Sequence, residues 1–354
     1  MLEFITELLA IETKTYHEKN CADFIQKWVK ENCPGALVMR EGNNLIISNN
    51  KPNKPHISLI GHSDTVPAFF KPYIKGDQLH ASGASDMKTA VGIFLHLFKE
   101  LYQSLDYHLS VIVYDKEEMT PVTSNGLYEC IKYHNDFMKS IDCAIIGEPT
   151  NNAIQIGCVG SLHMRLTVHG QACHSARPWN GENALYKALP LITYFSNLEP
   201  VKQRIFGVDF FDVIQLTESE SEPGRTSLPG WWRTNINFRF SPNLSEVEAQ
   251  RQLKAHVAKF TSISTDLELI DSVYPGKVIE TPLFELLTNL IDEPIEAKQA
   301  WTDVAQLTEL GVPAFNYGPG LQAQAHQVDE YIHIPDIYKY HKKLKLTLER
   351  IVHD

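Results

Sequence analysis

Short apolar runs that alternate with segments of helical periodicity constrain the fold of this chain more than any other feature. The runs HISLIGHSD, HLSVIVYD and CAIIGEPT have the length and composition of buried strands, and PAFNYG repeats the pattern near the C-terminus. Between the first two runs, the apolar residues of 93–101 have the spacing of one helix face. This alternation predicts an α/β fold with a mostly parallel sheet flanked by helices.

A different pattern occupies the middle of the chain. In LHMRLTVHG and RTNINFRF, apolar and polar residues alternate, which is typical of an antiparallel sheet with one face in solvent. Each of these strands precedes a helical segment, and Ser245 and Glu248 form a capping box at the start of the second. The order predicts a ferredoxin-like α/β sandwich of residues 159–273, inserted into a discontinuous main domain of residues 1–158 and 274–354.

Composition narrows the class of protein. The formal net charge of -11 over 354 residues, without clustered Lys and Arg, argues against a nucleic-acid partner. The six cysteines are scattered without CxxC pairs, so we expect reduced thiols. The first residues lack the pattern of a secretory signal, and no apolar run approaches the length of a membrane span. We therefore expect a cytoplasmic protein with no membrane partner.

Side chains that bind metals follow four of the predicted strands. A lone histidine at a strand end is more often structural, and paired glutamates are more often a solvated charge pair, so no single residue is decisive. Together, two imidazoles and three carboxylates suit a pair of zinc ions better than one structural site, with one carboxylate bridging. The candidate segments contain His62, Asp86, Glu117 with Glu118, Glu148, and His326.

The motifs GHSDTVP, GASDMK, YDKEE, IIGEPT and GPG…AH occur in the order of a known family. Over nearly its whole length, the chain resembles the dinuclear-zinc family of aminoacylases, acetylornithine deacetylases, glutamate carboxypeptidases and succinyl-diaminopimelate desuccinylases. The resemblance implies a zinc-exopeptidase-like catalytic domain and an inserted lid domain through which a homodimer forms. It also implies two Zn²⁺ per subunit, with Co²⁺ or another divalent ion as an alternative at one site.

The resemblance also implies a role for each ligand. His62 and Glu148 would bind one zinc ion, Glu118 and His326 would bind the other, and Asp86 would bridge both.

Three further residues receive catalytic roles from the same resemblance. Asp64 would orient His62, although a turn-forming aspartate is the structural alternative. Glu117 would act as general base on a metal-bridging water and return the proton to the departing amine. His174 would reach the active site of the partner subunit and stabilise the oxyanion, whereas without the resemblance it reads as a surface histidine.

The substrate is expected to be an N-acyl amino acid. Within the family, the segments around His174 and His326 most resemble actinobacterial-type desuccinylases, which hydrolyse N-succinyl-LL-2,6-diaminopimelate. Its carboxylates need cationic partners, for which Arg239 is the first candidate and Arg177 the second. Arg239 equally fits a charge on a sheet surface.

One departure from the family pattern leaves the specificity open. The chain reads GRTSLPG where the family usually has an NVIPD-like segment that helps to bind substrate. Another family amidohydrolase, such as an N-acetylornithine or N-acyl-amino-acid deacetylase or a carboxypeptidase-like enzyme, is the main alternative. A non-catalytic binding protein is the other, although all five expected ligands and Glu117 are present.

Overall fold

The computed structural model describes residues 1–66, 69–118 and 122–351, and the chain divides into two compact units. The first unit comprises Met1–Gly157, Lys277–Ala297 and Thr302–Asp354, and the second comprises Cys158–Gly276 and Lys298–Trp301. Each unit has its own sheet and its own helices.

An eight-stranded sheet forms the centre of the first unit, in the order β1-β2-β6-β3-β7-β17-β8-β16. Strands β6, β3, β7 and β17 are parallel neighbours, whereas β2 pairs with β6 and β17 pairs with β8 in antiparallel fashion. Every residue of β3, β6 and β7 is buried, as expected for parallel strands covered on both faces. The bounds are β1 Leu37–Glu41, β2 Asn44–Ser48, β3 His56–His62, β6 His108–Tyr114, β7 Cys143–Ile146, β8 Ile154–Ile156, β16 Ile295–Ala297 and β17 Ala314–Asn316.

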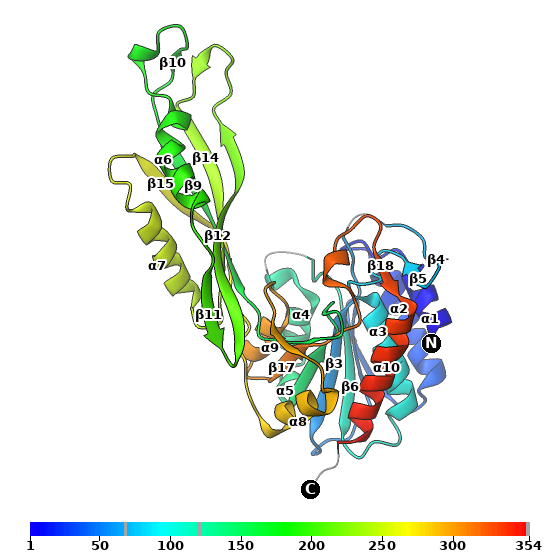
Figure 1. Cartoon of the computed structure of the whole chain (residues 1–354). Coiled ribbons are helices and arrows are strands. Elements are labelled where there is room, and N and C mark those ends of the chain that lie inside the picture. The colour runs from blue at the N-terminus through cyan, green and yellow to red at the C-terminus, as the bar shows by residue number, and fades with distance from the viewer. Residues whose placement is uncertain (67–68, 119–121, 352–354) are drawn as a thin grey trace. The chain divides into compact units, whose positions relative to one another are not determined.

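Helices cover both faces of this sheet. Figure 1 shows α3 and α10 on one side and α4 and α5 on the other, and α3 packs directly on β3 and β6. The helices are α1 Leu2–Leu9, α2 Lys19–Asn32, α3 Lys88–Leu101, α4 Gly126–Tyr133, α5 Asn135–Lys139, α8 Pro282–Ile291, α9 Val304–Glu309 and α10 Ile334–Glu349. A small sheet in this unit contains β4 Tyr73–Lys75, β5 Gln78–His80 and β18 Tyr331–His333.

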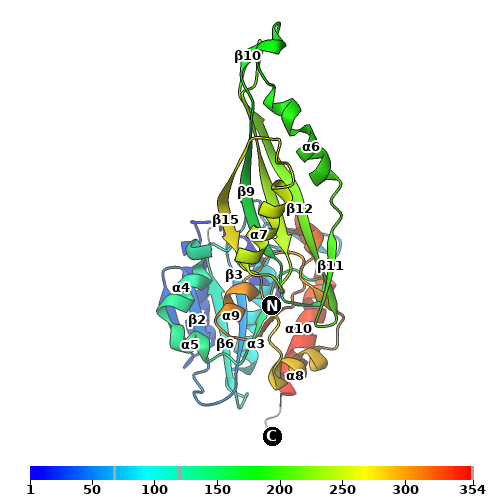
Figure 2. The same cartoon turned by 90° about the vertical axis from the view of Figure 1, so that its left-hand side faces the viewer.

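The second unit contains a five-stranded antiparallel sheet in the order β11-β12-β14-β9-β15. Figures 1 and 2 show α6 and α7 on the same face of this sheet. The bounds are β9 Gly160–His169, α6 Ala184–Ser196, β11 Val201–Ile205, β12 Val208–Ser221, β14 Trp231–Phe240, α7 Glu246–Val257 and β15 Thr265–Val273. Without the edge strand β11, the order of strands and helices is that of a ferredoxin-like sandwich, so the predicted fold class is confirmed.

Alternating side chains separate the two faces of the second sheet. Leu162, Met164 and Leu166 of β9 pack with Ile236 and Phe238 of β14 under the helices. The intervening residues of both strands project from the opposite face, because successive side chains alternate along a strand. The sheet therefore has one apolar face and one polar face.

Two further expectations concern cysteines and membranes. All six cysteines are free thiols, and five of them are buried. Within the described ranges, no helix has both the length and the apolar character needed to cross a membrane.

The core of the second unit can be tested with two leucines on adjacent strands. Leu166 is fully buried, whereas 46% of Leu269 on β15 is exposed. Leu166→Ala should lower the free energy of unfolding by about 2–5 kcal/mol because it leaves a cavity. Leu269→Ala should change it by less than about 0.5 kcal/mol.

The measurement uses denaturant unfolding followed by tryptophan fluorescence in a Trp28→Phe background. That background confines the remaining tryptophans, Trp179, Trp231, Trp232 and Trp301, to the second unit. Equal effects of the two leucine substitutions would contradict the assigned core.

Candidate metal centre

The predicted ligands lie on loops at the C-terminal ends of four adjacent parallel strands. His62 is the last residue of β3, Glu118 follows β6, and Glu148 follows β7. His326 follows β17 after the short 3-10 helix Gln322–Gln324, and Asp86 lies just before α3. Because β6, β3, β7 and β17 are neighbours, these loops meet at one edge of the sheet, where open α/β folds bind ligands.

The structure brings the ligand atoms into overlapping groups. In each group one donor atom per residue lies within 4.8 Å of the others, and the groups are His62–Asp86–Glu148, Asp86–Glu118–His326 and His62–Glu117–Glu118. Asp86 belongs to the first two groups through different oxygens. Its Oδ1 lies 3.2 Å from Nε2 of His62, and its Oδ2 lies 3.8 Å from Nε2 of His326.

The two groups that share Asp86 differ in exposure. His62 is fully buried, whereas 56% of the His326 side chain is exposed. Nε2 of His326 also lies 3.0 Å from Oε2 of Glu118. One side of the candidate centre is thus enclosed by protein, and the His326 side is open to solvent.

Crowded carboxylates dominate the electrostatics of the centre. Desolvation, followed by the neighbouring charges of Glu148 and Glu118, raises the pKa of Glu117 well above its ordinary value, while His62 opposes the shift. The hydrogen bond with Glu118 raises the pKa of His326 to about 9. Four carboxylates and two imidazoles in this space carry an excess of negative charge, which divalent cations would neutralise. The donor set therefore fits divalent metal ions.

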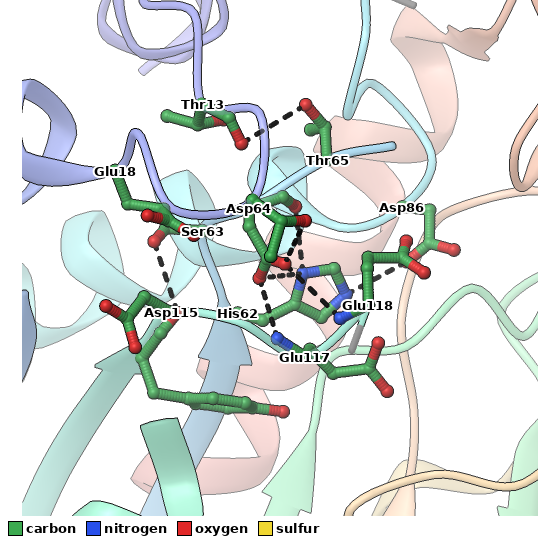
Figure 3. Close-up of polar contacts among 12 residues, drawn as sticks. Thr13, Glu18, His62, Ser63, Asp64, Thr65, Asp86, Asp115, Glu117 and Glu118 are labelled. Carbon is green, nitrogen blue, oxygen red and sulfur yellow. Dashed lines mark hydrogen bonds and ion pairs between the residues drawn. The ribbon is translucent and has the colours of Figure 1, made fainter. Parts of the chain in front are cut away.

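Asp64 contacts both the buried histidine and the loop that follows β6. Nδ1 of His62 lies 3.0 Å from the carbonyl oxygen of Asp64 and 3.5 Å from its Oδ1. The Asp64 carboxylate also accepts hydrogen bonds from the backbone N–H groups of Glu117, at 3.0 Å, and Glu118, at 3.2 Å. Figure 3 shows His62 between Asp64 and Asp86.

These contacts determine the orientation of His62. Burial alone would raise the pKa of Asp64, but the hydrogen bonds from His62 and from the two backbone N–H groups lower it. For His62 the signs are reversed. Burial would lower its pKa, but its hydrogen bonds to Asp64 and Asp86 raise it. A proton on Nδ1, facing Asp64, would leave Nε2, which lies 3.2 Å from Asp86 and 3.8 Å from Glu148, able to bind a metal ion in place of its hydrogen bond to Asp86.

Sequence reasoning missed Glu330, which holds the loop that carries Asp86. Its buried carboxylate accepts hydrogen bonds from the backbone N–H groups of Gly83, Ser85 and Asp86 at 2.7, 2.6 and 2.8 Å. The peptide bond after Asp86 is cis. In the sequence, no spacing or motif distinguishes Glu330 from its neighbour Asp329, because its partners are more than 240 residues away.

A second missed cluster lies behind the loop that carries Glu117. Tyr114, the last residue of β6, donates a hydrogen bond to the buried carboxylate of Asp303. Asn125 and Gln306 donate to Oδ1 of the same carboxylate at 3.0 and 2.5 Å. Burial raises the pKa of Asp303. This network fixes the end of β6, from which the Glu117 loop begins.

The remaining predicted residues belong to the second unit. His174 lies in β10 (Cys173–His174), which pairs with β13 (Ser227–Leu228), and its exposed imidazole accepts a hydrogen bond from the Ala176 N–H at 3.1 Å. Arg177 is exposed in the loop that follows. Arg239 projects from the polar face of β14, where its Nε donates to Oδ1 of Asn237 at 3.2 Å. None of these three joins the described ligand groups of the first unit.

Comparison with known proteins finds a family model and a relative that match most of the chain. The model of peptidase family M20/M25/M40 matches residues 58–350. A succinyl-diaminopimelate desuccinylase from Corynebacterium glutamicum is 31% identical over 341 residues, which cover 93% of this chain and 91% of the relative.

Two solved structures share the fold at low sequence identity. An aminopeptidase from Bacillus cereus has a TM-score of 0.76 and 15% identity, covering 98% of this chain and 97% of its own. A dinuclear metal-binding M20 peptidase from Bacillus subtilis has a TM-score of 0.71 and 11% identity, covering 98% and 96%. The resemblance that the motifs indicated is confirmed: the chain belongs to peptidase family M20/M25/M40.

Proposed function

We propose that the protein is a metal-dependent amidohydrolase that converts N-succinyl-LL-2,6-diaminopimelate to succinate and LL-2,6-diaminopimelate. The observation that carries the proposal is the pair of ligand groups that share Asp86 at the C-terminal edge of the sheet. The similarity to the Corynebacterium desuccinylase extends along most of both chains and supports the choice of substrate.

The residues of the centre divide into two sets of ligands. We assign His62, Glu148 and Asp86 to one divalent ion, and Glu118, His326 and Asp86 to the other. Imidazole with carboxylate suits zinc, so Zn²⁺ is the proposed metal at both positions. When bound, paired divalent ions lower the pKa of water and polarise a carbonyl oxygen.

Glu117 is the proposed proton carrier. It lies beside Glu118 and within reach of His62, yet it is outside both sets of ligands that share Asp86. Its carboxylate takes a proton from the attacking water as the new C–O bond forms. It then gives that proton to the amide nitrogen as the C–N bond breaks. The amine leaves neutral, and the new carboxyl group of the succinyl product keeps the second proton of the water until it ionises in solvent. Asp64 keeps the His62 imidazole in place throughout.

The second unit supplies the proposed contacts to the rest of the substrate. Arg239 and Arg177 bind substrate carboxylates, for which a planar guanidinium is suited. His174 stabilises the oxyanion in the active site of a partner subunit, so the enzyme acts as a homodimer through this unit. The six free cysteines support a cytoplasmic location.

Substitution of the proposed base tests the mechanism. Glu117→Gln should lower kcat by about 10²–10⁴-fold, because the amide side chain cannot accept the proton from water. The variant should retain the metal content of the unsubstituted protein, since Glu117 is not a ligand. The measurements are kcat and metal analysis of the same preparations.

Glu309→Gln is the matched control, because Glu309 is exposed and forms a surface ion pair with Lys277. It should leave both kcat and metal content unchanged. If Glu117→Gln kept activity within about threefold of the unsubstituted enzyme, Glu117 would not be the base.

The choice of substrate is tested by comparing kcat/KM for a succinylated and an acetylated compound. On purified, zinc-loaded protein, kcat/KM for N-succinyl-LL-2,6-diaminopimelate should exceed that for N-acetyl-L-ornithine by about 100-fold, because the acetyl compound keeps one α-carboxylate but lacks the succinyl carboxylate and the second amino-acid carboxylate. A higher kcat/KM for the acetyl compound would identify a deacetylase instead. Hydrolysis of neither, with zinc bound, would indicate another family substrate or a binding protein.

A further inference from the structure

The polar face of the second unit contains a hollow of ≈ 550 Å³ in which Arg239 lies next to a histidine and two asparagines. His163 on β9 stands directly opposite Asn237 on β14, and Asn235 precedes Asn237 by two residues on the same face. Side chains that face each other across neighbouring strands are close enough to interact.

A continuous chain of hydrogen bonds connects these residues. Nε of Arg239 donates to Oδ1 of Asn237 at 3.2 Å, and Nδ2 of Asn237 lies 3.0 Å from Nε2 of His163. On the other side of the ring, Nδ2 of Asn235 lies 3.1 Å from Nδ1 of His163 and donates to the Thr217 hydroxyl at 2.7 Å. The chain crosses β14, β9 and β12.

The chain has a direction because a guanidinium can only donate hydrogen bonds. Arg239 must therefore face the oxygen of Asn237, which turns the NH₂ group of that amide toward Nε2 of His163. Nε2 then accepts from that NH₂ group, and the Ser161 hydroxyl, 3.2 Å from the same Nε2, can also donate to it. The single proton of a neutral imidazole is therefore on Nδ1. Because Nδ1 then carries a proton, it cannot accept from Nδ2 of Asn235. The Asn235 amide must therefore turn by 180°, so that its oxygen accepts from both Nδ1 of His163 and the Thr217 hydroxyl.

The charges around His163 are compatible with a neutral ring. Burial, and to a lesser degree the positive charge of Arg239, lowers its pKa, whereas Asp271 on β15 and Glu218 on β12 oppose that shift. Asp271 stands opposite His163 in the register of β15 and β9.

Most donors of Arg239 remain available. A guanidinium carries five N–H bonds, and Asn237 accepts only the one on Nε. Among the residues that the structure describes, no carboxylate forms an ion pair with Arg239, although its side chain lines the hollow. The two terminal nitrogens can therefore bind a carboxylate in bidentate fashion.

We propose that Asn237, His163 and Asn235 are positioning residues that orient the Arg239 guanidinium for a carboxylate of the substrate, and that Arg239 in turn fixes His163 as its Nδ1–H tautomer. The role in substrate binding rests on the proposed function. The hydrogen-bond chain itself does not, so the two can be tested separately.

The tautomer is measured by NMR of full-length protein labelled with ¹⁵N-histidine, with His163→Phe used to assign the signals. At a pH where the ring is neutral, Nδ1 of His163 should appear as the protonated nitrogen and Nε2 as the unprotonated one. In Arg239→Met, Asn237 is free to turn, and both tautomers should be populated. A proton on Nε2 in the unsubstituted protein would overturn the proposal.

Kinetics with the succinylated substrate tests the positioning role. Asn237→Ala should raise KM by about tenfold with kcat changed by less than about twofold, because a charged hydrogen-bonding group loses its fixed direction. Arg233→Gln, on the same face of β14 but outside the chain, is the matched control and should leave KM unchanged. An unchanged KM in Asn237→Ala, or an equal rise in both variants, would refute the positioning role.

The two measurements separate the possible failures. The expected tautomer in a protein that does not hydrolyse the succinylated substrate would refute the proposed function and leave the hydrogen-bond chain intact. Hydrolysis of the succinylated substrate by a protein in which Nε2 of His163 carries the proton would refute the hydrogen-bond chain and leave the proposed function intact.

Discussion

Repulsion between carboxylates packed at one edge of a parallel sheet is the constraint on which the rest of this structure depends. Glu117, Glu118 and Glu148 follow adjacent strands that end together, and the loop before α3 brings Asp86 among them. Such a cluster is stable only if cations share the space or protons neutralise it. The surrounding loops are held in place by hydrogen bonds from backbone N–H groups to Glu330 and Asp64. The hydrogen bond from Tyr114 to Asp303 also contributes. The fold thus fixes the positions of charges that would otherwise separate.

In the second unit, hydrogen bonds orient a cationic side chain on a sheet surface. One face of its antiparallel sheet packs against α6 and α7 to form the core. Side chains that bind a ligand must therefore lie on the other face or in a loop. A single guanidinium on that face would rotate freely, because its side chain has many rotamers. Its hydrogen bond to Asn237 on the same strand, together with the cross-strand bond between Asn237 and His163, restricts its orientation.

Local sequence pattern was sufficient for the main buried strands and for the alternating strands of the second unit, and the family motifs were sufficient to name candidate ligands. The apolar run of β3 and the alternation of β14 predict a buried parallel strand and a half-exposed antiparallel one, and both are confirmed. Glu330 and Asp303 escaped prediction because their partners are far away in the chain. No sequence pattern singled out His163, because its partners depend on the register of β9 and β14.

The most direct test of the central claim is the zinc stoichiometry of Asp86→Ala beside the unsubstituted protein. Both are dialysed against the same free zinc concentration and analysed by mass spectrometry of the metal, with folding checked by circular dichroism. The account predicts two zinc ions per unsubstituted chain, and a loss of zinc from both positions in the variant, because Asp86 contributes one oxygen to each group. An unsubstituted protein without zinc, or a variant that still binds two ions with unchanged affinity, would contradict it.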